Sequence, residues 1–207
     1  MLTAMPIKTR GRPRKQIDEA LLDAAIDEFL LHGYNDANLD RIAAAGGSTK
    51  PALYRRYTSK ESLFEAALWH FANEFQPDLS CLEGDRAPAD ALYDLALLFH
   101  DKLGSAKVIA STRLGAAESA RFPALIMRFR ERIMSGFIPR MAAYFSDLDA
   151  RGILQIVDTQ DAAIIFTSLT GRPFDRVLGA VVDDRQLEAH LRELVRFFMA
   201  GYAPRPT

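Results

Sequence analysis

Apolar residues recur at intervals of three and four positions along most of the chain, which is the period of amphipathic helices. This spacing begins abruptly at Ile17 and continues to Phe29, after which Gly33 is a candidate helix stop. It returns in several later stretches, and the last of them forms one apolar stripe that ends at Tyr202. Only residues 150–158 resemble a strand, and we interpret this short isolated segment as a connection. The pattern therefore predicts an all-α fold without a sheet.

Two of the expected helices are unusually short and follow each other closely. Asn38 suits the N-cap of the first, and the glycines at 46–47 end it within about two turns. Ser48 or Thr49 caps the second, in which Pro51 takes a first-turn position where proline is tolerated. Helices this short are not stable alone in water, so we expect them to pack against their neighbours.

Prolines and capping residues predict where the later helices begin and end. Thr58 and Glu61 have the spacing of a capping box at the start of a longer helix. Pro88 can open another, and a break is expected in a later helix near Gly136 and Pro139.

The composition is that of a packed globular protein, because 49% of the 207 residues are hydrophobic and 26% are charged. Cys81 is the only cysteine, which excludes an internal disulfide and a metal site built from cysteine pairs. The sequence shows neither a signal peptide nor an apolar stretch long enough to span a membrane. We therefore expect a cytoplasmic protein that does not associate with membranes.

Charge is unevenly distributed along the chain. Residues 1–60 hold ten lysines and arginines against seven acidic residues, a net charge of +3, whereas the remainder holds 16 against 20, a net charge of −4. A basic head on an acidic body is typical of proteins that bind a polyanion.

Residues 38–60 have the spacing of a helix-turn-helix. Two short helices that cross steeply need a small residue in the first, a tight turn, and an apolar anchor in the second. Ala43, Gly47 and Leu53 meet these three requirements. The outer face of the second helix then stays free, and no carboxylate occurs from Ile42 to Lys60. Such a surface is suited to the phosphates and base edges of a DNA groove.

The flanking sequence resembles the tetracycline-repressor (TetR) family. LLDAAIDEFLLHGY is similar to the family's first helix, NLDRIAAAGG to its second, STKPALYRRY to its recognition helix and TSKESLFEAAL to its fourth. Gly46 and Ser48 depart from the family pattern, which usually has alanine and an apolar residue there, so we expect a looser turn. The resemblance implies a DNA-binding domain at 16–60, after a basic arm at 1–15, and a larger helical ligand-binding and dimerisation domain at 61–207.

The resemblance also implies contacts with double-stranded DNA. The expected groove-facing or base-edge residues are Lys50, Pro51, Ala52 and Arg55, and the expected phosphate contacts are Asn38, Thr49, Tyr54, Arg56 and Lys60. The arm carries the segment GRPRK, whose composition suits a narrow minor groove, and this adds Arg12 and Arg14 as candidates.

Predictions for the larger domain are coarser. Aromatic residues with polar residues among them could line a cavity for a small, partly apolar effector, and the candidates are Trp69, Phe99, His100, Arg113, Phe129, Arg130 and Phe137. TetR-like proteins form homodimers through their last two helices, which implies an interface of Ile165, Phe166, Leu169, Leu187, Leu191, Leu194, Phe198 and Tyr202. Two-fold pairing predicts a palindromic operator and a regulator, by family expectation a repressor.

Two other function classes stay open at this point. The basic face could contact an acidic protein partner, which would make the chain a helical interaction module. An enzyme is the weaker alternative, because the four histidines are scattered and no metal-binding histidine motif or glycine-rich phosphate loop is present. We therefore predict no catalytic residues, no metal and no cofactor.

Overall fold

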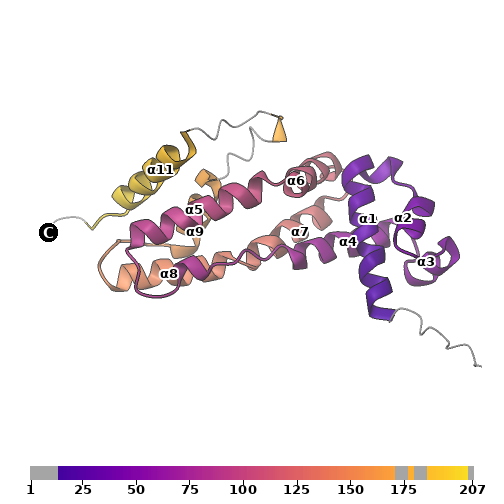
Figure 1. The fold of residues 1–207 in the computed structure, drawn as a ribbon, viewed down its shortest axis with the longest axis horizontal. Coiled ribbons are helices and arrows are strands. Elements are labelled where there is room, and N and C mark those ends of the chain that lie inside the picture. Colours follow the sequence, from indigo (N-terminus) through magenta and orange to yellow (C-terminus); the bar gives the residue numbers. More distant parts are fainter. Residues whose placement is uncertain (1–13, 171–176, 180–185, 205–207) are drawn as a thin grey trace, which may run out of the picture. The chain divides into compact units, whose positions relative to one another are not determined.

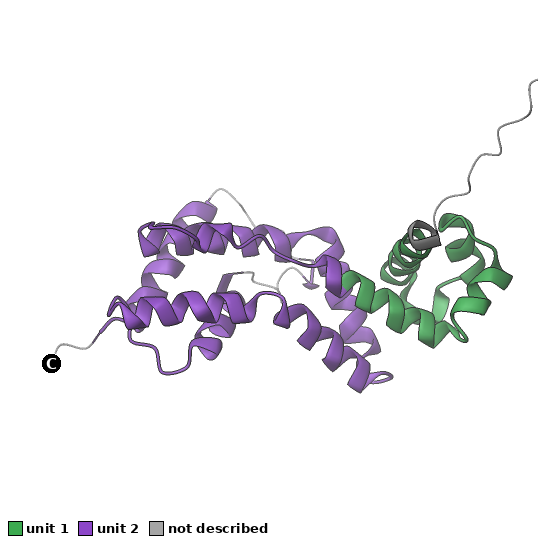
Figure 2. Ribbon diagram, turned by 90° about the horizontal axis from the view of Figure 1, so that it is seen from below, with its two compact units in different colours: residues 1–71 green, residues 72–207 purple. Residues whose placement is uncertain are grey.

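The computed structural model describes residues 14–170, 177–179 and 186–204, with side chains from residue 18 onward. The chain divides into two compact units, residues 1–71 and 72–207 (Figure 2). Every regular element in the described ranges is a helix, and these ranges contain no strand (Figure 1). The all-α prediction is confirmed. The division between the units falls within the fourth helix, whereas the sequence placed the domain boundary after residue 60.

Unit 1 is built around a small aromatic core. Phe29 and Phe64 meet edge to face with their ring centroids 4.9 Å apart, and Tyr34 packs against both rings. Ile42 of one short helix and Leu53 of the other are also buried, with exposed fractions of 0% and 1%, so each short helix is anchored by one large apolar side chain. The helices of unit 1 are α1 (Arg14–Asp36), α2 (Leu39–Ala45), α3 (Lys50–Arg56) and α4 (Lys60–Glu74), the last of which extends beyond residue 71.

Local sequence signals set the ends of these helices, with one shift. Gly33 has a φ of 73°, which interrupts the helical backbone of α1 as expected from its sequence position. The capping box of α4 is formed by Ser59 and Ser62, whose hydroxyls each accept the other residue's backbone N–H at 3.1 Å. The prediction of a box from Thr58 to Glu61 is therefore wrong by one residue.

Gly46, at the end of α2, lies directly against α1. A Cβ atom added there would lie 2.7 Å from Leu21 Cα, because the end of α2 presses directly on α1. Gly47 takes a φ of 64°, a conformation that glycine adopts without strain. Gly46 therefore allows α2 to approach α1 more closely than alanine would, and the looser α2–α3 turn stays a prediction.

Unit 2 contains the remaining helices, and prolines mark several of their starts. Pro88 and Pro123 begin helices, and the break predicted near Gly136 and Pro139 is confirmed between Ser135 and Ile138. The interruption expected near residues 171–173 lies outside the described residues. The elements are the 3₁₀ turn η1 (Ser80–Leu82) and the helices α5 (Pro88–Gly104), α6 (Ala106–Glu118), α7 (Pro123–Ser135), α8 (Ile138–Ala150), α9 (Thr159–Thr170) and α11 (Leu187–Gly201).

An aromatic core holds unit 2 together. Helix α8 packs along α9, and α5 contacts both α9 and α11. Between them Phe145, Phe166 and Phe198 form a group with ring centroids 5.0 to 6.2 Å apart. Phe99 and Phe137 form a second pair at 5.1 Å. Burial of such large side chains is the main favourable contribution to folding of the unit. In the part of the chain that the structure describes, no helix is long and apolar enough to cross a membrane.

Candidate nucleic-acid interface

The first helix of the bihelical motif, α2, is held by its N-cap. The Asn38 carboxamide oxygen accepts hydrogen bonds from the backbone N–H groups of Asp40 at 2.8 Å and Arg41 at 3.3 Å. At the other end of α2, Ser48 donates its N–H to the Ala43 carbonyl oxygen at 2.8 Å across the turn. The predicted N-cap is confirmed. Asn38 is exposed, but its side-chain oxygen already accepts hydrogen bonds from the first backbone N–H groups of α2.

The second helix, α3, shows one side to the core and the other to solvent. The Thr49 hydroxyl caps it by accepting the Ala52 N–H at 3.4 Å, and Pro51 lies in its first turn. Leu53 points into the core and is 1% exposed. The opposite side carries a continuous ridge of exposed residues, which we call the α3 ridge: Thr49, Lys50, Pro51, Tyr54 and Arg55. Helix α3 thus meets the geometric requirement for a recognition helix, because hydroxyl and cationic groups face outward.

Two carboxylates from outside the 42–60 window approach this helix, which its local sequence does not reveal. Lys50 Nζ lies 2.8 Å from Asp40 Oδ2 across the α2–α3 turn, and both side chains are solvent-exposed. Arg56 Nε lies 2.8 Å from Asp18 Oδ1 of α1, and the Arg56 side chain is largely buried. The hydrogen bond to Asp40 raises the pKa of Lys50, so its ammonium stays charged at neutral pH. Of the two cations, Lys50 remains on the α3 ridge, whereas Arg56 ties α3 to α1.

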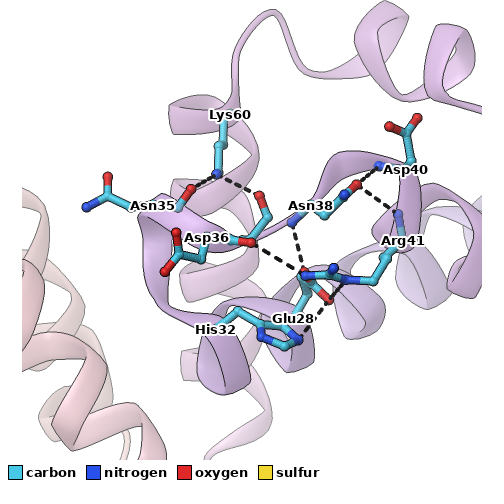
Figure 3. Close-up of polar contacts among 9 residues, drawn as sticks. Glu28, His32, Asn35, Asp36, Asn38, Asp40, Arg41 and Lys60 are labelled. Atoms are coloured by element: carbon cyan, nitrogen blue, oxygen red, sulfur yellow. Dashed lines mark hydrogen bonds and ion pairs between the residues drawn. The ribbon is translucent and has the colours of Figure 1, made fainter.

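A polar network around Glu28 fixes the start of α2 against α1 (Figure 3). The Glu28 carboxylate accepts the Asn38 backbone N–H at 2.8 Å and receives Arg41 Nε at 3.0 and 3.1 Å. The Glu28 side chain is only 10% exposed, and His32 Nε2 lies 3.8 Å from it. The hydrogen bond from Arg41, aided by that from Asn38, lowers the pKa of Glu28 in spite of its burial. Sequence reasoning missed this residue, because nothing local marks Glu28 among the acids of its helix.

Lys60 lies close to this network and binds backbone carbonyl groups (Figure 3). Its Nζ donates to the carbonyl oxygens of Asn35 at 2.8 Å and Ala37 at 2.7 Å, and it lies 5.3 Å from the ring centroid of Tyr34. Its ammonium therefore satisfies backbone acceptors between α1 and α2. A phosphate contact by Lys60 stays a prediction, as do the contacts assigned to the α3 ridge, Ala52, Arg56 and Asn38. Arg12 lies outside the described residues, and Arg14 begins α1 without a described side chain.

The residues predicted to bind an effector lie in different environments. Phe99 and Phe137 pack against each other in the core of unit 2, and His100 and Phe129 are buried as well. By contrast Arg113 and Arg130 are exposed, and Arg113 Nε donates to the Val177 carbonyl oxygen at 2.8 Å. Trp69 belongs to unit 1, where its Nε1 donates to Glu65 at 3.3 Å.

The residues predicted to form a dimer interface divide by burial. The members that fill the protomer core are Phe166, Leu191, Leu194 and Phe198, none more than 9% exposed. Leu187 and Tyr202 are partly buried and pack against that core, which leaves Ile165 and Leu169 at 37% and 40% exposure. Two further large apolar side chains of these helices, α9 and α11, are exposed, Ile164 at 38% and Phe197 at 69%. Phe198 follows the core position Leu194 by four residues, so helical periodicity favoured Phe198 for the buried side, and the structure shows Phe198 buried and its neighbour Phe197 facing solvent.

Family comparisons cover both parts of the chain. The family described as "Bacterial regulatory proteins, tetR family" matches residues 21–67. The family described as "AefR-like transcriptional repressor, C-terminal domain" matches residues 90–204, more than half of the chain.

Individual relatives match less than half of the chain. The HTH-type transcriptional repressor ComR of Escherichia coli is 36% identical over 94 residues, which cover 44% of this chain and 45% of ComR. The regulator RutR of Escherichia coli is 30% identical over 94 residues, 44% of each chain. The chain thus matches less than half the length of these curated relatives.

Solved structures match nearly the whole chain. A TetR-family transcriptional regulator from Mesorhizobium loti has a TM-score of 0.82 at 24% identity and is covered completely by 93% of this chain. The flavonoid-responsive regulator FrrA has a TM-score of 0.73 at 29% identity, with 94% of this chain and 100% of FrrA covered. The fold is thus that of TetR-family regulators, and the two family matches, one of which covers more than half of the chain, establish that the chain belongs to the TetR family of transcriptional regulators.

Proposed function

We propose that the protein binds a palindromic site in double-stranded DNA as a homodimer and that a small molecule changes this binding. The observation that carries the proposal is the α3 ridge, which stands outward because Leu53 anchors the opposite side of the helix in the core. Lys50 and Arg55 supply cationic groups, and Thr49 and Tyr54 supply hydroxyls, at the surface that would enter a major groove. Repression, rather than activation, is the direction that the matched family's description favours.

The proposed dimer would use exposed apolar residues on the last two described helices. Ile164, Ile165 and Leu169 on α9 and Phe197 on α11 are each at least 37% exposed. Large apolar side chains grouped on a protein surface are favoured interface residues. Pairing of two protomers would place two α3 ridges on one duplex, about 34 Å or a small multiple of it apart.

The proposed effector response belongs to unit 2. FrrA, which is similar over nearly the full length, is described as flavonoid-responsive, and this supports a small and partly apolar effector here. For such a molecule to act, its affinities for the DNA-bound and DNA-free states must differ, typically by about 1–3 kcal/mol. The proposal assigns no catalytic residue, and the cytoplasmic location stays a prediction.

Selection from a random duplex pool tests DNA binding without knowledge of the operator. The wild-type protein is expected to enrich an inverted repeat, and Lys50→Ala and Tyr54→Ala are each expected to weaken binding to it by about 1–3 kcal/mol. The matched control Lys102→Ala changes an exposed lysine in unit 2 and should leave affinity unchanged. No enriched sequence, or equal effects of all three substitutions, would contradict the proposal and favour a protein partner for the basic face.

A further inference from the structure

Unit 2 has a pocket that none of the predicted effector contacts lines. Its volume is about 370 Å³, near the lower end of the range of about 300–1,000 Å³ for small-molecule sites. One side is formed by the segment around η1 together with the start of α5, and the other by α8. The size suits a compact ligand of roughly a dozen water volumes, at about 30 Å³ for each water.

The walls of this pocket combine apolar surface with guanidinium groups. Leu79, which is 1% exposed, and Ala91, which is 2% exposed, supply part of an apolar floor. Three arginines also line the pocket: Arg86 from the segment before α5, and Arg140 and Arg151 from the two ends of α8. Because a guanidinium presents a planar fork of donors, it binds a carboxylate with two parallel hydrogen bonds.

The arginines differ in how firmly they are paired. Arg86 Nη2 donates to Asp94 Oδ2 at 2.7 Å, and Asp94 does not line the pocket. Arg140 is less constrained, because its nearest acidic atom, Glu83 Oε1, is 3.8 Å away, too far for a hydrogen bond. Among the described residues, Arg140 has no other recorded ion pair or hydrogen bond. The N–H groups of Arg140 can therefore donate hydrogen bonds to a ligand without first breaking a close ion pair.

Two carboxylates that line the pocket would repel an anion, but both side chains are exposed and only weakly held in place. The Glu83 side chain is 74% exposed, and Asp147, which binds Arg151 at 3.0 Å within α8, is 56% exposed. Exposed ion pairs of this kind contribute only about 0–1 kcal/mol, so a ligand carboxylate can replace them at small cost. With three arginines against these two acids, the lining has a net charge of +1.

Two further polar groups in the lining are uncharged at neutral pH. Burial is the main cause that raises the pKa of both the Tyr144 phenol and the Cys81 thiol. Tyr144 therefore keeps its O–H as a hydrogen-bond donor, and Cys81 adds no negative charge to the pocket. Both properties are compatible with an anionic ligand.

We propose that this pocket binds a small organic acid, with its carboxylate on Arg140 and its apolar part against Leu79 and Ala91. The placement follows because Arg140, the guanidinium with the most available donors, lines the same pocket as the buried apolar residues Leu79 and Ala91. This inference concerns binding alone, and it holds or fails independently of DNA recognition and of dimer formation.

Cys81 makes the test direct, because it lines the pocket and is the only cysteine in the chain. The rate of its alkylation by iodoacetamide is measured in the full-length protein with octanoate, benzoate or indole-3-acetate at millimolar concentration. Each acid is compared with its neutral amide, which has the same shape without the charge. At least one acid is expected to slow alkylation several-fold while its amide has little effect.

Two variants assign the protection to Arg140. Arg140→Gln is expected to abolish protection, whereas Arg192→Gln, which changes an exposed arginine on α11 outside this pocket, should retain it. The comparison uses the ratio of rates with and without the acid for each folded variant, checked by circular dichroism. Equal protection by acid and amide, unchanged protection in Arg140→Gln, or no protection by any of the three acids would overturn the proposal. Because no DNA is present, failure here is distinct from failure of the regulator proposal.

Discussion

At the scale of single residues, Lys60 has its charged group directed into the protein. Its Nζ holds the carbonyl oxygens of Asn35 and Ala37, which lie where α1 ends and α2 begins. Family resemblance alone suggested a phosphate contact at this position. The two roles differ in what they predict, because a structural ammonium contributes to stability whereas a phosphate contact contributes to the salt dependence of DNA binding.

Lys60→Gln is therefore expected to lower the free energy of unfolding by about 1 kcal/mol. Urea denaturation measures this change. The same substitution should leave the slope of log affinity against log salt concentration unchanged for the selected duplex. Lys50→Gln is the contrast, since the loss of its exposed side chain is expected to weaken binding to the duplex with little effect on stability. A reduced slope for Lys60→Gln would show that Lys60 contacts a phosphate.

Glu28 is a second residue whose role comes from its neighbours. Its carboxylate receives Arg41 and the N–H of Asn38, and these hydrogen bonds lower its pKa below the ordinary value of 4.5. A carboxylate with a lowered pKa in the folded state contributes stability that is fully present above its unfolded pKa. That contribution is lost as the pH falls through the folded value.

The free energy of unfolding of wild type and Glu28→Gln should therefore differ most at neutral pH. The difference is expected to shrink as the pH falls below about 4.5, since both chains then carry an uncharged group at this position. Chemical denaturation over a pH series measures it, with the exposed neighbour Asp36→Asn as the control. A difference that stays constant down to the acid limit would show that the Glu28 charge does not support the fold.

At the scale of helices, much of the structure could be predicted from local sequence. Asn38 and Thr49 cap α2 and α3 and Pro88 begins a helix, all as expected, because each signal depends on backbone groups only a few residues away. Long-range contacts explain what was missed. The need for glycine at 46 comes from Leu21 on another helix, and the approach of Asp40 to Lys50 requires the turn to be folded.

Gly46→Ala tests the tight contact between α1 and α2. The added methyl would meet the backbone and side chain of Leu21 at 2.7 and 2.8 Å, so the helices must separate. Overpacking of this kind typically costs about 1–3 kcal/mol, which thermal or urea unfolding would detect. Gly201→Ala provides the contrast, because its methyl meets open space near the end of α11 and should be neutral or stabilising. Equal stability of Gly46→Ala and wild type would show that α1 yields at no cost.

At the scale of the whole molecule, the chain separates its tasks between two units. Unit 1 carries the α3 ridge, and unit 2 carries both the arginine-lined pocket and the exposed apolar residues of α9 and α11. Single-sequence periodicity identified both of these helices as amphipathic. Periodicity could not distinguish the protomer core from an intermolecular surface. Both are apolar, and they differ only in which side of the helix faces the rest of the chain. Phe197 and Phe198 are neighbours with opposite surroundings.

Phe197→Asp tests the proposed dimer because it leaves the protomer core intact. Phe197 is 69% exposed, so an aspartate there is solvated in the monomer but would lose its hydration in an interface. We expect the substitution to weaken dimerisation by at least about 2 kcal/mol, which is a roughly 30-fold higher dissociation constant in sedimentation equilibrium. Val157→Asp is the control, since Val157 is fully exposed and lies between α8 and α9 rather than on either helix. The Phe197 variant should lose affinity for the full palindrome and retain that for one half-site. If it stays dimeric, the protomers pair through another surface, and the α3 ridges must be spaced by a different contact than α9 and α11 provide.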